Sequence, residues 1–527
     1  MGKHDEEEAI IEVKECCSTR DVLWYLVFTG FAVNYMIRIN LNIAIVAMIQ
    51  AKPKDNVSLT SECLELSGSV LSRLGENNQT NAMHTELPPQ TQNHNFPLTT
   101  PLPPSALVAN ISNDKFVWDE KIQGYILGSF FWMHWTTQIP GGLLANKYGT
   151  KKVFGLSNFA GVILCFFLPY FAKMGAKPLM ALRLLQGIVT GFSWPSMADM
   201  TARWIPPNER SKFVTAYLGS SVGAALTYPI CGYIIDKFDW EYVFYASTVF
   251  GTLWFVAWWS LVHDSPSQHP RISQHEKEYI LKSLGESVAK KKAPIPWRHI
   301  LQNRTVWMNV LAQWGGCWGL FTLMTQAPTY FKFIHGWNIR ATGVLSGLPH
   351  LVRMLWAYMF SMLGDYLLRS NKMSRSNVRK LATAFSCIGQ GIFMMALAYS
   401  GCDAMAAIVF LTMAIAIHGS VSTGPLASVV DISPNYAAVI MGFLNTSAAI
   451  VGFFTPAVVG YLTYQNQTTP QWQKVFWISS GWLFGSGLLY VFVAKSELQP
   501  WNSPEKNIPE QELMVLARND IKENNEK

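Results

Sequence analysis

The chain contains few charged residues for its length. Only 14% of its 527 residues are Asp, Glu, Lys or Arg, whereas soluble domains carry about 25%. Half of the residues are hydrophobic, and the mean hydropathy is +0.16. This composition excludes an ordinary set of soluble domains, and we expect much of the apolar surface to face a lipid bilayer.

Cysteine is also scarce, and other patterns are absent. Eight cysteines in a chain of this length cannot form a disulfide scaffold, and none stands in a metal-ligand spacing, so no metal site is expected. The net charge of +7 is divided among short runs between apolar stretches, which argues against a nucleic-acid partner. No cluster of catalytic side chains stands at the ends of those stretches, so an enzyme is not expected.

What the chain has in quantity is long apolar stretches, each of about the 20 residues that cross a bilayer. The twelve stretches are residues 22–50, 121–145, 153–173, 178–202, 213–235, 241–263, 305–332, 341–367, 380–400, 404–427, 435–462 and 474–494. They predict an all-α membrane protein with twelve transmembrane helices in two six-helix halves. A cleaved signal peptide is not expected, because the first apolar run is too long and follows an acidic, polar segment.

Two polar segments set the domain organisation. The predicted parts are a cytosolic tail (1–21), a first half (22–263) containing an extracytosolic loop (51–120), a cytosolic linker (264–304), a second half (305–494) and a cytosolic tail (495–527). The orientation follows from the basic residues, which fall on one side when the spans alternate. Both termini are therefore expected in the cytosol.

The loop at 51–120 carries the features expected outside the cytosol. It holds glycosylation sequons at Asn56, Asn78 and Asn110. Cys63 in this loop and Cys402 are the two cysteines predicted on the oxidising side of the membrane, and they are either bridged or free.

The two halves share a sequence pattern after their second spans. Residues 142–152 and 364–369 each contain a glycine, a short polar side chain and then basic residues. Equivalent turns in two six-span halves are typical of major-facilitator transporters, whose halves are parallel repeats.

Longer motifs sharpen this assignment. They are RINLNIAIV at 38–46, GSFFW at 128–132, TQIPGG at 137–142, PPNERSK at 206–212, HEKEYI at 275–280 and VDISP at 430–434. By these motifs the chain resembles the anion:cation symporters of the major-facilitator superfamily, the group of sialin, the vesicular glutamate transporters and the type I sodium-phosphate cotransporters. The resemblance implies alternating access with anion movement coupled to Na⁺ or H⁺.

Arginines inside the spans are the main candidates for substrate binding. Charge at bilayer depth is costly and usually faces a functional cavity, and guanidinium matches carboxylate or phosphate bidentately. Arg38, with Asn42 beside it, lies in the first span; Arg183 opens the fourth, and Arg353 lies in the eighth. Family resemblance implies substrate binding for Arg38 and Arg183. A structural brace is the alternative for Arg38, and interior packing is the alternative for Arg353.

A second set of residues is predicted to take part in coupling or gating. Thr190 replaces a glutamate that sialin and the glutamate transporters carry, and Asp199 stands beside a position where the family has histidine. His134 and His418 lie at bilayer depth, where an imidazole can relay a proton or simply be hydrogen-bonded. Gly316 replaces a seventh-span arginine of the glutamate transporters, which argues against their specificity.

Acidic residues at the cytosolic span ends suggest gates. Asp365, Glu209 and Asp431 are expected to form inter-helix ion pairs that hold one access state closed, each worth little alone.

The sequence therefore predicts a symporter of a small anion, either inorganic phosphate or an organic carboxylate. The alternatives are a sialin-like proton-coupled organic-anion exporter and an anion sensor that does not transport. No cofactor is expected beyond the coupling Na⁺ or H⁺. The predicted partners are the substrate and the bilayer, the protein is expected to be a monomer, and its membrane is either the plasma membrane or a lysosomal or vesicular one.

Overall fold

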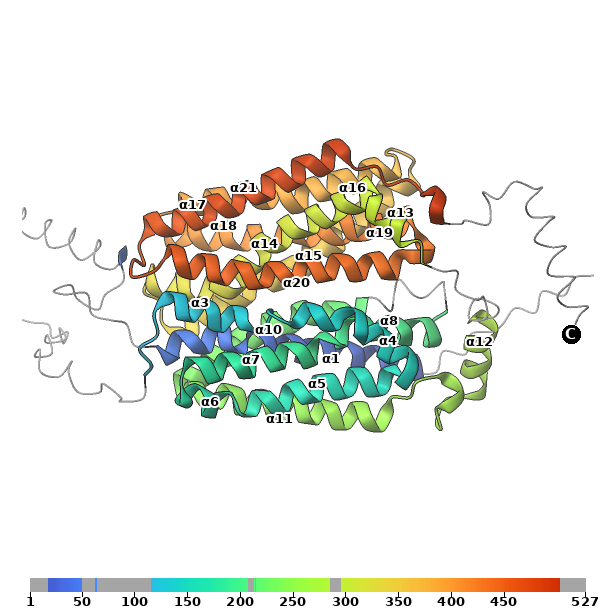
Figure 1. The fold of residues 1–527 in the computed structure, drawn as a ribbon, viewed down its shortest axis with the longest axis horizontal. Helices are drawn as coiled ribbons and strands as arrows, with labels where there is room; N and C mark the ends of the chain where they lie inside the picture. Colours follow the sequence, from blue (N-terminus) through green and yellow to red (C-terminus); the bar gives the residue numbers. More distant parts are fainter. Residues whose placement is uncertain are drawn as a thin grey trace, which may run out of the picture.

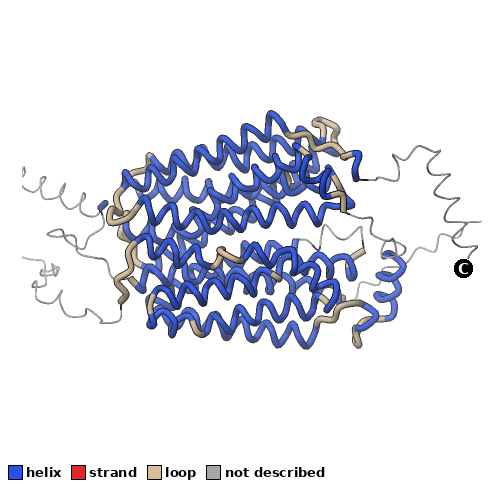
Figure 2. Tube along the Cα trace, in the orientation of Figure 1, coloured by secondary structure: helices blue, strands red, loops and turns tan. Residues whose placement is uncertain are grey.

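The computed structural model describes residues 18–49, 62–63, 115–206, 213, 215–284 and 295–502. Within these ranges the regular structure is helical and there is no β-strand (Figure 2). The long helices run side by side in two groups, one from each half of the chain (Figure 1). This arrangement confirms the predicted all-α fold in two halves.

The first half is built from six successive helical rods, several of them broken. The rods are α1 (Thr19–Met48); α3 (Glu120–Ser129), η2 (His134–Thr137) and α4 (Gln138–Tyr148); α5 (Thr150–Phe166) and α6 (Leu168–Met174); α7 (Ala176–Gly191) and α8 (Ser193–Trp204); η4 (Thr215–Leu218) and α10 (Gly219–Lys237); and α11 (Trp240–Leu261). A capping box between Ser18 and Asp21 begins α1. The chain then reaches the second half through α12 (Gln274–Leu284) and α13 (Trp297–Gln302).

The second half repeats the pattern. Its rods are α14 (Arg304–Phe333); α15 (Ile339–Arg369); α16 (Arg375–Thr383), η7 (Ala384–Gly389) and α17 (Gln390–Ala398); α18 (Ala404–Ile417), η8 (His418–Ser422) and α19 (Pro425–Ile432); α20 (Ala437–Leu462); and α21 (Thr469–Val493). The rods coincide with the predicted stretches, but several are interrupted where the sequence predicts continuous helices. Such breaks are tolerated at membrane depth where the freed backbone groups find local partners, as in the hydrogen bonds from Thr136 N–H to the carbonyl oxygen of Met133 (3.1 Å) and from Thr423 N–H to that of Ser420 (3.1 Å).

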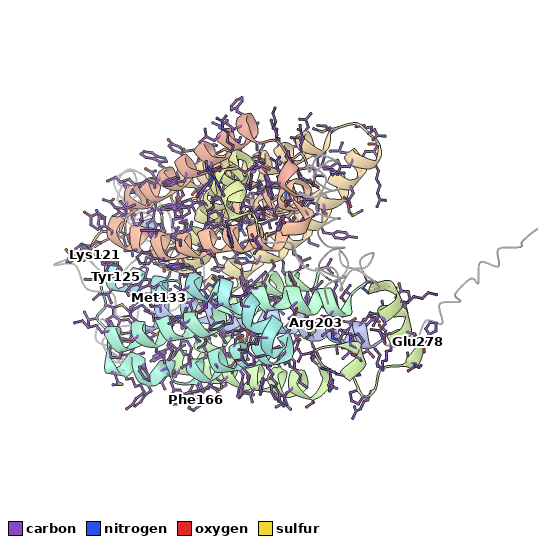
Figure 3. All side chains as sticks on the ribbon, turned by 45° about the vertical axis from the view of Figure 1, so that its right-hand side comes forward. Lys121, Tyr125, Met133, Phe166, Arg203 and Glu278 are labelled. Carbon is purple, nitrogen blue, oxygen red and sulfur yellow. A yellow bond between two sulfur atoms is a disulfide. The ribbon has the colours of Figure 1, made fainter. Side chains whose placement is uncertain are left out.

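The helices have the apolar character that a bilayer requires. Within the described ranges, six are long and apolar enough to cross a membrane, or seven if α5 and α6, bent by 47°, form one span. The other rods also run the length of the bundle, but none of their helices is both long enough and apolar enough to be counted as a span by itself. Large apolar side chains such as Phe166 and Phe492 are exposed on the outside of the bundle, and Figure 3 shows Phe166 there. Lipid rather than water is the medium that suits this surface.

The bundle has two different ends. At one end, Cys63 and Cys402 form a disulfide with their Cα atoms 5.4 Å apart, which resolves the alternatives left open by the sequence. We call this the disulfide end. At the opposite end lies α12, in the segment that links the halves, and we call this the linker end (Figure 1).

At the disulfide end the two halves bind each other. The Glu62 carboxylate accepts hydrogen bonds from the backbone N–H (2.6 Å) and the hydroxyl (3.0 Å) of Thr469, the first residue of α21. The Glu120 carboxylate accepts one from the backbone N–H of Gln465 (2.9 Å). Lys121, at one extremity of the bundle in Figure 3, lies 3.8 Å from the ring centroid of Tyr464. Each contact joins a residue of the first half to one of the second.

Close helix approach strengthens this inter-half contact. A Cβ atom at Gly460 of α20 would collide with the carbonyl oxygen of Glu120, and one at Gly124 of α3 would collide with that of Pro456. A Cβ atom at Gly343 of α15 would lie 2.6 Å from the carbonyl oxygen of Tyr228 in α10. Small residues therefore let the backbones of opposite halves touch, as in many membrane bundles.

At the linker end the ion pairs between described residues have a different role. They join elements of one half, or one half and α12: Asp431 of α19 with Arg379 of α16 (2.6 Å), Asp199 with Arg203 within α8 (2.9 Å), and Glu276 of α12 with Arg20 of α1 (3.0 Å). Figure 3 shows Arg203 and Glu278 toward this end. These pairs consolidate each half without fastening it to the other.

Candidate functional site

Arg38 lies in the interior of α1, enclosed by aromatic rings. Its guanidinium carbon is 4.5 Å from the ring centroid of Phe131 and 5.3–5.5 Å from those of Tyr35, Phe130 and Phe321. Phe321 belongs to α14, so both halves contribute to this enclosure. Among the described residues, no carboxylate pairs with Arg38, and its buried Nε has no hydrogen-bond partner. Rings attract the cation without neutralising it, so it keeps its attraction for an anion.

Arg183 is buried beside Arg38 but already has protein partners. Its guanidinium donates hydrogen bonds to the carbonyl oxygens of Ile37 (3.2 Å) and Arg38 (2.9 Å), and to the side-chain oxygen of Gln186 (2.7 Å). These bonds tie α7 to α1 at the level of Arg38. The geometry is that of a brace that positions Arg38, whereas the sequence analysis expected Arg183 to contact the substrate.

Two coupling candidates in the first half are likewise engaged. The Thr190 hydroxyl donates to the carbonyl oxygen of Gln186 in its own helix (2.8 Å). His134 contacts the carbonyl oxygen of Gly187 through Nδ1 (3.0 Å) and the Gln138 side chain through Nε2 (3.2 Å). Both ring nitrogens of His134 are therefore occupied.

Arg353 supplies a second cation from the opposite half. It lies near the middle of α15 and donates a hydrogen bond to the hydroxyl of Ser221 in α10 (3.2 Å), while its buried Nε has no partner among the described residues. Tyr35 and Cys317 lie within electrostatic range of both Arg38 and Arg353. The two guanidinium groups therefore flank the same region between the halves.

His418 lies in the same half as Arg353. It is the first residue of η8, where the tenth rod breaks, and it is 2% exposed. Neither of its ring nitrogens has a hydrogen-bond partner among the described residues. A Cβ atom at Gly316 would lie 3.2 Å from His418 Nε2, so the glycine leaves room for the imidazole.

Asn42 joins the halves one turn beyond Arg38. Its amide nitrogen donates to the hydroxyl of Tyr228 (3.2 Å) and to the carbonyl oxygen of Met324 in α14 (3.3 Å), and the Tyr228 hydroxyl also donates to Met324. The Asn42 side chain therefore has structural partners in this conformation, and its role as a substrate ligand stays a prediction.

Some of the predicted gating residues form ion pairs in the structure and others do not. Asp199 bonds Arg203 (2.9 Å) and the hydroxyl of Thr150 (3.3 Å), and Asp431 pairs with Arg379 as expected, although within one half. The ion pair expected for Asp365 is not formed among the described residues, because its carboxylate is exposed at the end of α15, where solvent solvates it. Glu209 and the sequons at Asn56, Asn78 and Asn110 lie outside the described residues.

Sequence reasoning missed the rings and hydroxyls that surround the arginines. Phe130 and Phe131 lie within the GSFFW motif, and Tyr35 stands three residues before Arg38 on the same helix. These positions could have indicated that the three rings lie near the arginine. Nothing in the sequence distinguished Tyr228 or Ser221 from other residues of their type. His335, just beyond α14 at the disulfide end, was also missed; burial lowers its pKa, and nearby Asp403 opposes that shift.

Comparisons with known proteins agree with this architecture. The family model described as Major Facilitator Superfamily matches residues 27–456. Human sialin is 35% identical over 487 residues, covering 92% of this chain and 91% of sialin. A putative inorganic phosphate cotransporter of Drosophila melanogaster is 31% identical (93% and 88% covered), and vesicular glutamate transporter 1 of Xenopus tropicalis is 35% identical (76% and 70%).

Solved structures show the same fold. The crystal structure of a D-xylose-proton symporter matches with a TM-score of 0.59 at 13% identity, covering 90% of this chain and 98% of that one. Two six-rod halves with buried cations between them thus define a multi-pass secondary transporter rather than an enzyme. The chain belongs to the Major Facilitator Superfamily, and within it to the group that contains sialin and the vesicular glutamate transporters.

Proposed function

We propose that the protein moves a small anion, inorganic phosphate or an organic carboxylate, by alternating access coupled to Na⁺ or H⁺. The observation that carries this proposal is the pair of arginines, Arg38 and Arg353, which come from opposite halves and have no carboxylate partner among the described residues. An anion between them would complete the charge balance. Because each half contributes one arginine, a single bound anion can contact both halves as they move relative to each other during the transport cycle.

The relatives' names support the anion class. Sialin, a phosphate cotransporter and glutamate transporters share the fold of this chain and one third of its sequence. Thr190, where sialin-like sequences carry a glutamate, favours the phosphate branch, and the sialin-like exporter is the second candidate. We infer cytosolic termini, a monomer, and either a plasma or a lysosomal or vesicular membrane.

In this proposal the side chains have distinct roles. Arg38 and Arg353 bind the anion, with the rings around Arg38 excluding water from its guanidinium. Arg183 holds the backbone of α1 at Ile37 and Arg38, and so fixes the height of the Arg38 side chain in the bundle. No cofactor takes part beyond the coupling ion.

The test is uptake of radiolabelled phosphate, sialate, glutamate and urate into proteoliposomes under imposed Na⁺ or H⁺ gradients. The Arg38→Ala variant is expected to lower anion uptake by about a hundredfold, because it removes two charge-assisted hydrogen bonds to the anion. Arg298→Ala, which removes an exposed cation from α13, is the matched control and should transport like the wild type.

Unchanged uptake in folded Arg38→Ala protein would remove that residue from the site. Binding of an anion by the wild-type protein without any flux would favour the sensor instead of the transporter.

A further inference from the structure

His418 is a buried polar side chain that the protein leaves unsatisfied. It is 2% exposed, and neither Nδ1 nor Nε2 has a hydrogen-bond partner among the described residues. An unsatisfied buried polar group costs about 1–3 kcal/mol, and such groups in native structures call for an explanation. The contrast with His134, whose ring nitrogens both have partners, shows that bilayer depth alone does not impose this state.

The surrounding structure holds the His418 ring in place. Gly316 of α14 faces it, and a Cβ atom there would lie 3.2 Å from Nε2 and 3.3 Å from Cδ2, so the ring fills the space that a side chain would take. The next residue, Gly419, packs on α15, where its Cβ atom would lie 2.6 Å from the carbonyl oxygen of Arg353. The Trp356 indole N–H donates to the Ser420 hydroxyl (2.8 Å) and fixes η8 on the same helix.

The groups around the imidazole set its charge preference. From α15, the Arg353 guanidinium acts electrostatically on His418, and the His350 ring lies in the range of the same guanidinium. From η7 comes the thiol of Cys387, which faces the same Gly316 as the imidazole, and from α14 the thiol of Cys317 lies near Arg353; both are neutral when protonated. Among the described residues, no carboxylate forms an ion pair with Arg353. A positive neighbour and a dry interior both disfavour the imidazolium form until a negative charge arrives.

We propose that His418 is the proton-binding group of the transport cycle, taking up one proton as the anion binds beside Arg353. The proposal rests on the anion-transport function above and narrows its coupling ion to H⁺. The proton adds to an unpartnered ring nitrogen, the anion balances the new positive charge, and both leave together on the other side of the membrane. By linkage, the anion raises the proton affinity of the ring by the same factor as the proton raises the affinity for the anion.

This assignment explains how a site without a carboxylate can couple to protons. Thr190 cannot titrate, and protonation of His134 would have to break one of its existing contacts. His418 has free nitrogens and adjoins an anion-binding cation. Because the Arg353 guanidinium repels a positive charge on the ring, proton uptake without an anion is disfavoured, and so is proton leakage through the empty carrier.

The test uses full-length protein in proteoliposomes with an entrapped pH dye, and radiolabelled phosphate and sialate in parallel. In the wild type, external acid should accelerate uptake, and protons should enter with the anion. In His418→Gln, gradient-driven accumulation should fall at least about tenfold and the dye signal should disappear, because the amide cannot take up the proton. Exchange of internal for external anion should persist, because exchange needs no net proton movement.

His134→Gln is the comparison variant, and its ratio of protons to anions should match that of the wild type. His418→Asn is a second substitution in case the first one does not fold. A readout without any variant is the affinity of detergent-solubilised wild-type protein for phosphate and sialate, which should weaken as the pH rises from about 5.5 to 7.5.

The outcomes separate the two proposals. If His418→Gln retains proton entry and acid-stimulated accumulation, or if wild-type anion affinity does not change with pH, His418 is not the proton site. Sodium-driven uptake without proton entry would likewise overturn the His418 assignment while leaving anion transport intact. The absence of any anion flux or exchange in the wild type would instead overturn the proposed function.

Discussion

The disulfide end and the linker end of the bundle are held together in different ways. At the disulfide end a covalent bond, carboxylate hydrogen bonds and glycine-mediated contacts join one half to the other. At the linker end the ion pairs between described residues stay within one half or attach it to α12. Alternating access requires that the halves separate at one end while they meet at the other. The structure therefore represents the state in which the disulfide end is the closed one.

Removing the disulfide between Cys63 and Cys402 should have the largest effect on the stability of the disulfide end. Cys63→Ser and Cys402→Ser should each destabilise the folded protein by about 2–4 kcal/mol, because the bridge closes a very long loop between the halves. The loss of stability is measured by heating samples of the purified protein and determining, by size-exclusion chromatography, how much folded protein remains at each temperature. The double variant should lose no more than either single one, and additive losses would show that the two cysteines act separately.

Close packing of α3 on α20 should be the next most sensitive feature. Gly460→Val places a side chain against the backbone carbonyl of Glu120, and such overpacking costs about 1–3 kcal/mol. We expect a lower melting temperature and slower anion uptake, because the disulfide end can no longer close. Gly442→Val is the matched control on the same helix, since a Cβ atom there meets nothing within 4 Å. Equal effects of the two substitutions would contradict the glycine contact.

A change at the linker end should have a smaller and more local effect. Asp431→Asn weakens the pair with Arg379, which also donates to the carbonyl oxygen of Thr423 (2.9 Å), so the expected loss is about 1 kcal/mol. Hydrogen exchange should accelerate in α16 and α19 and stay unchanged at the disulfide end. Faster exchange around Cys63 and Cys402 would show that the two ends are coupled through this pair.

The sequence was most informative about the architecture. Low charge and long apolar runs predicted the helical membrane bundle, and the matched motifs identified the family. The breaks within the rods were missed, because each interrupted stretch, such as that around His418, remains apolar overall and its backbone geometry depends on neighbouring helices. The ion pair expected for Asp365 does not form among the described residues in this state, in which the disulfide end is the closed one. A pair that closes the linker end belongs to the other access state, so its formation stays a prediction.

For the site, the residue types were predictable but their roles were not. Arg38, Arg183 and Arg353 all stood out as cations at bilayer depth, and the family resemblance favoured Arg38 and Arg183 as the substrate ligands. Only the packed structure shows that the terminal nitrogens of Arg183 bind the α1 backbone. Arg38 is instead enclosed by aromatic rings, and Arg353 donates to the Ser221 hydroxyl. Similarly, His134 and His418 were equivalent in sequence and differ in whether a hydrogen-bond partner faces the ring.

The sequence by itself determined that this chain lies in a membrane, folds as two six-helix halves and places excess positive charge at bilayer depth. These properties follow from residue composition and periodicity, which act along the chain. Tertiary structure alone decided which end is closed in this state, which arginine braces α1, and that His418 rather than His134 has no hydrogen-bond partner on either ring nitrogen among the described residues. Those outcomes depend on contacts between residues that are far apart in the sequence, and no local pattern encodes such contacts.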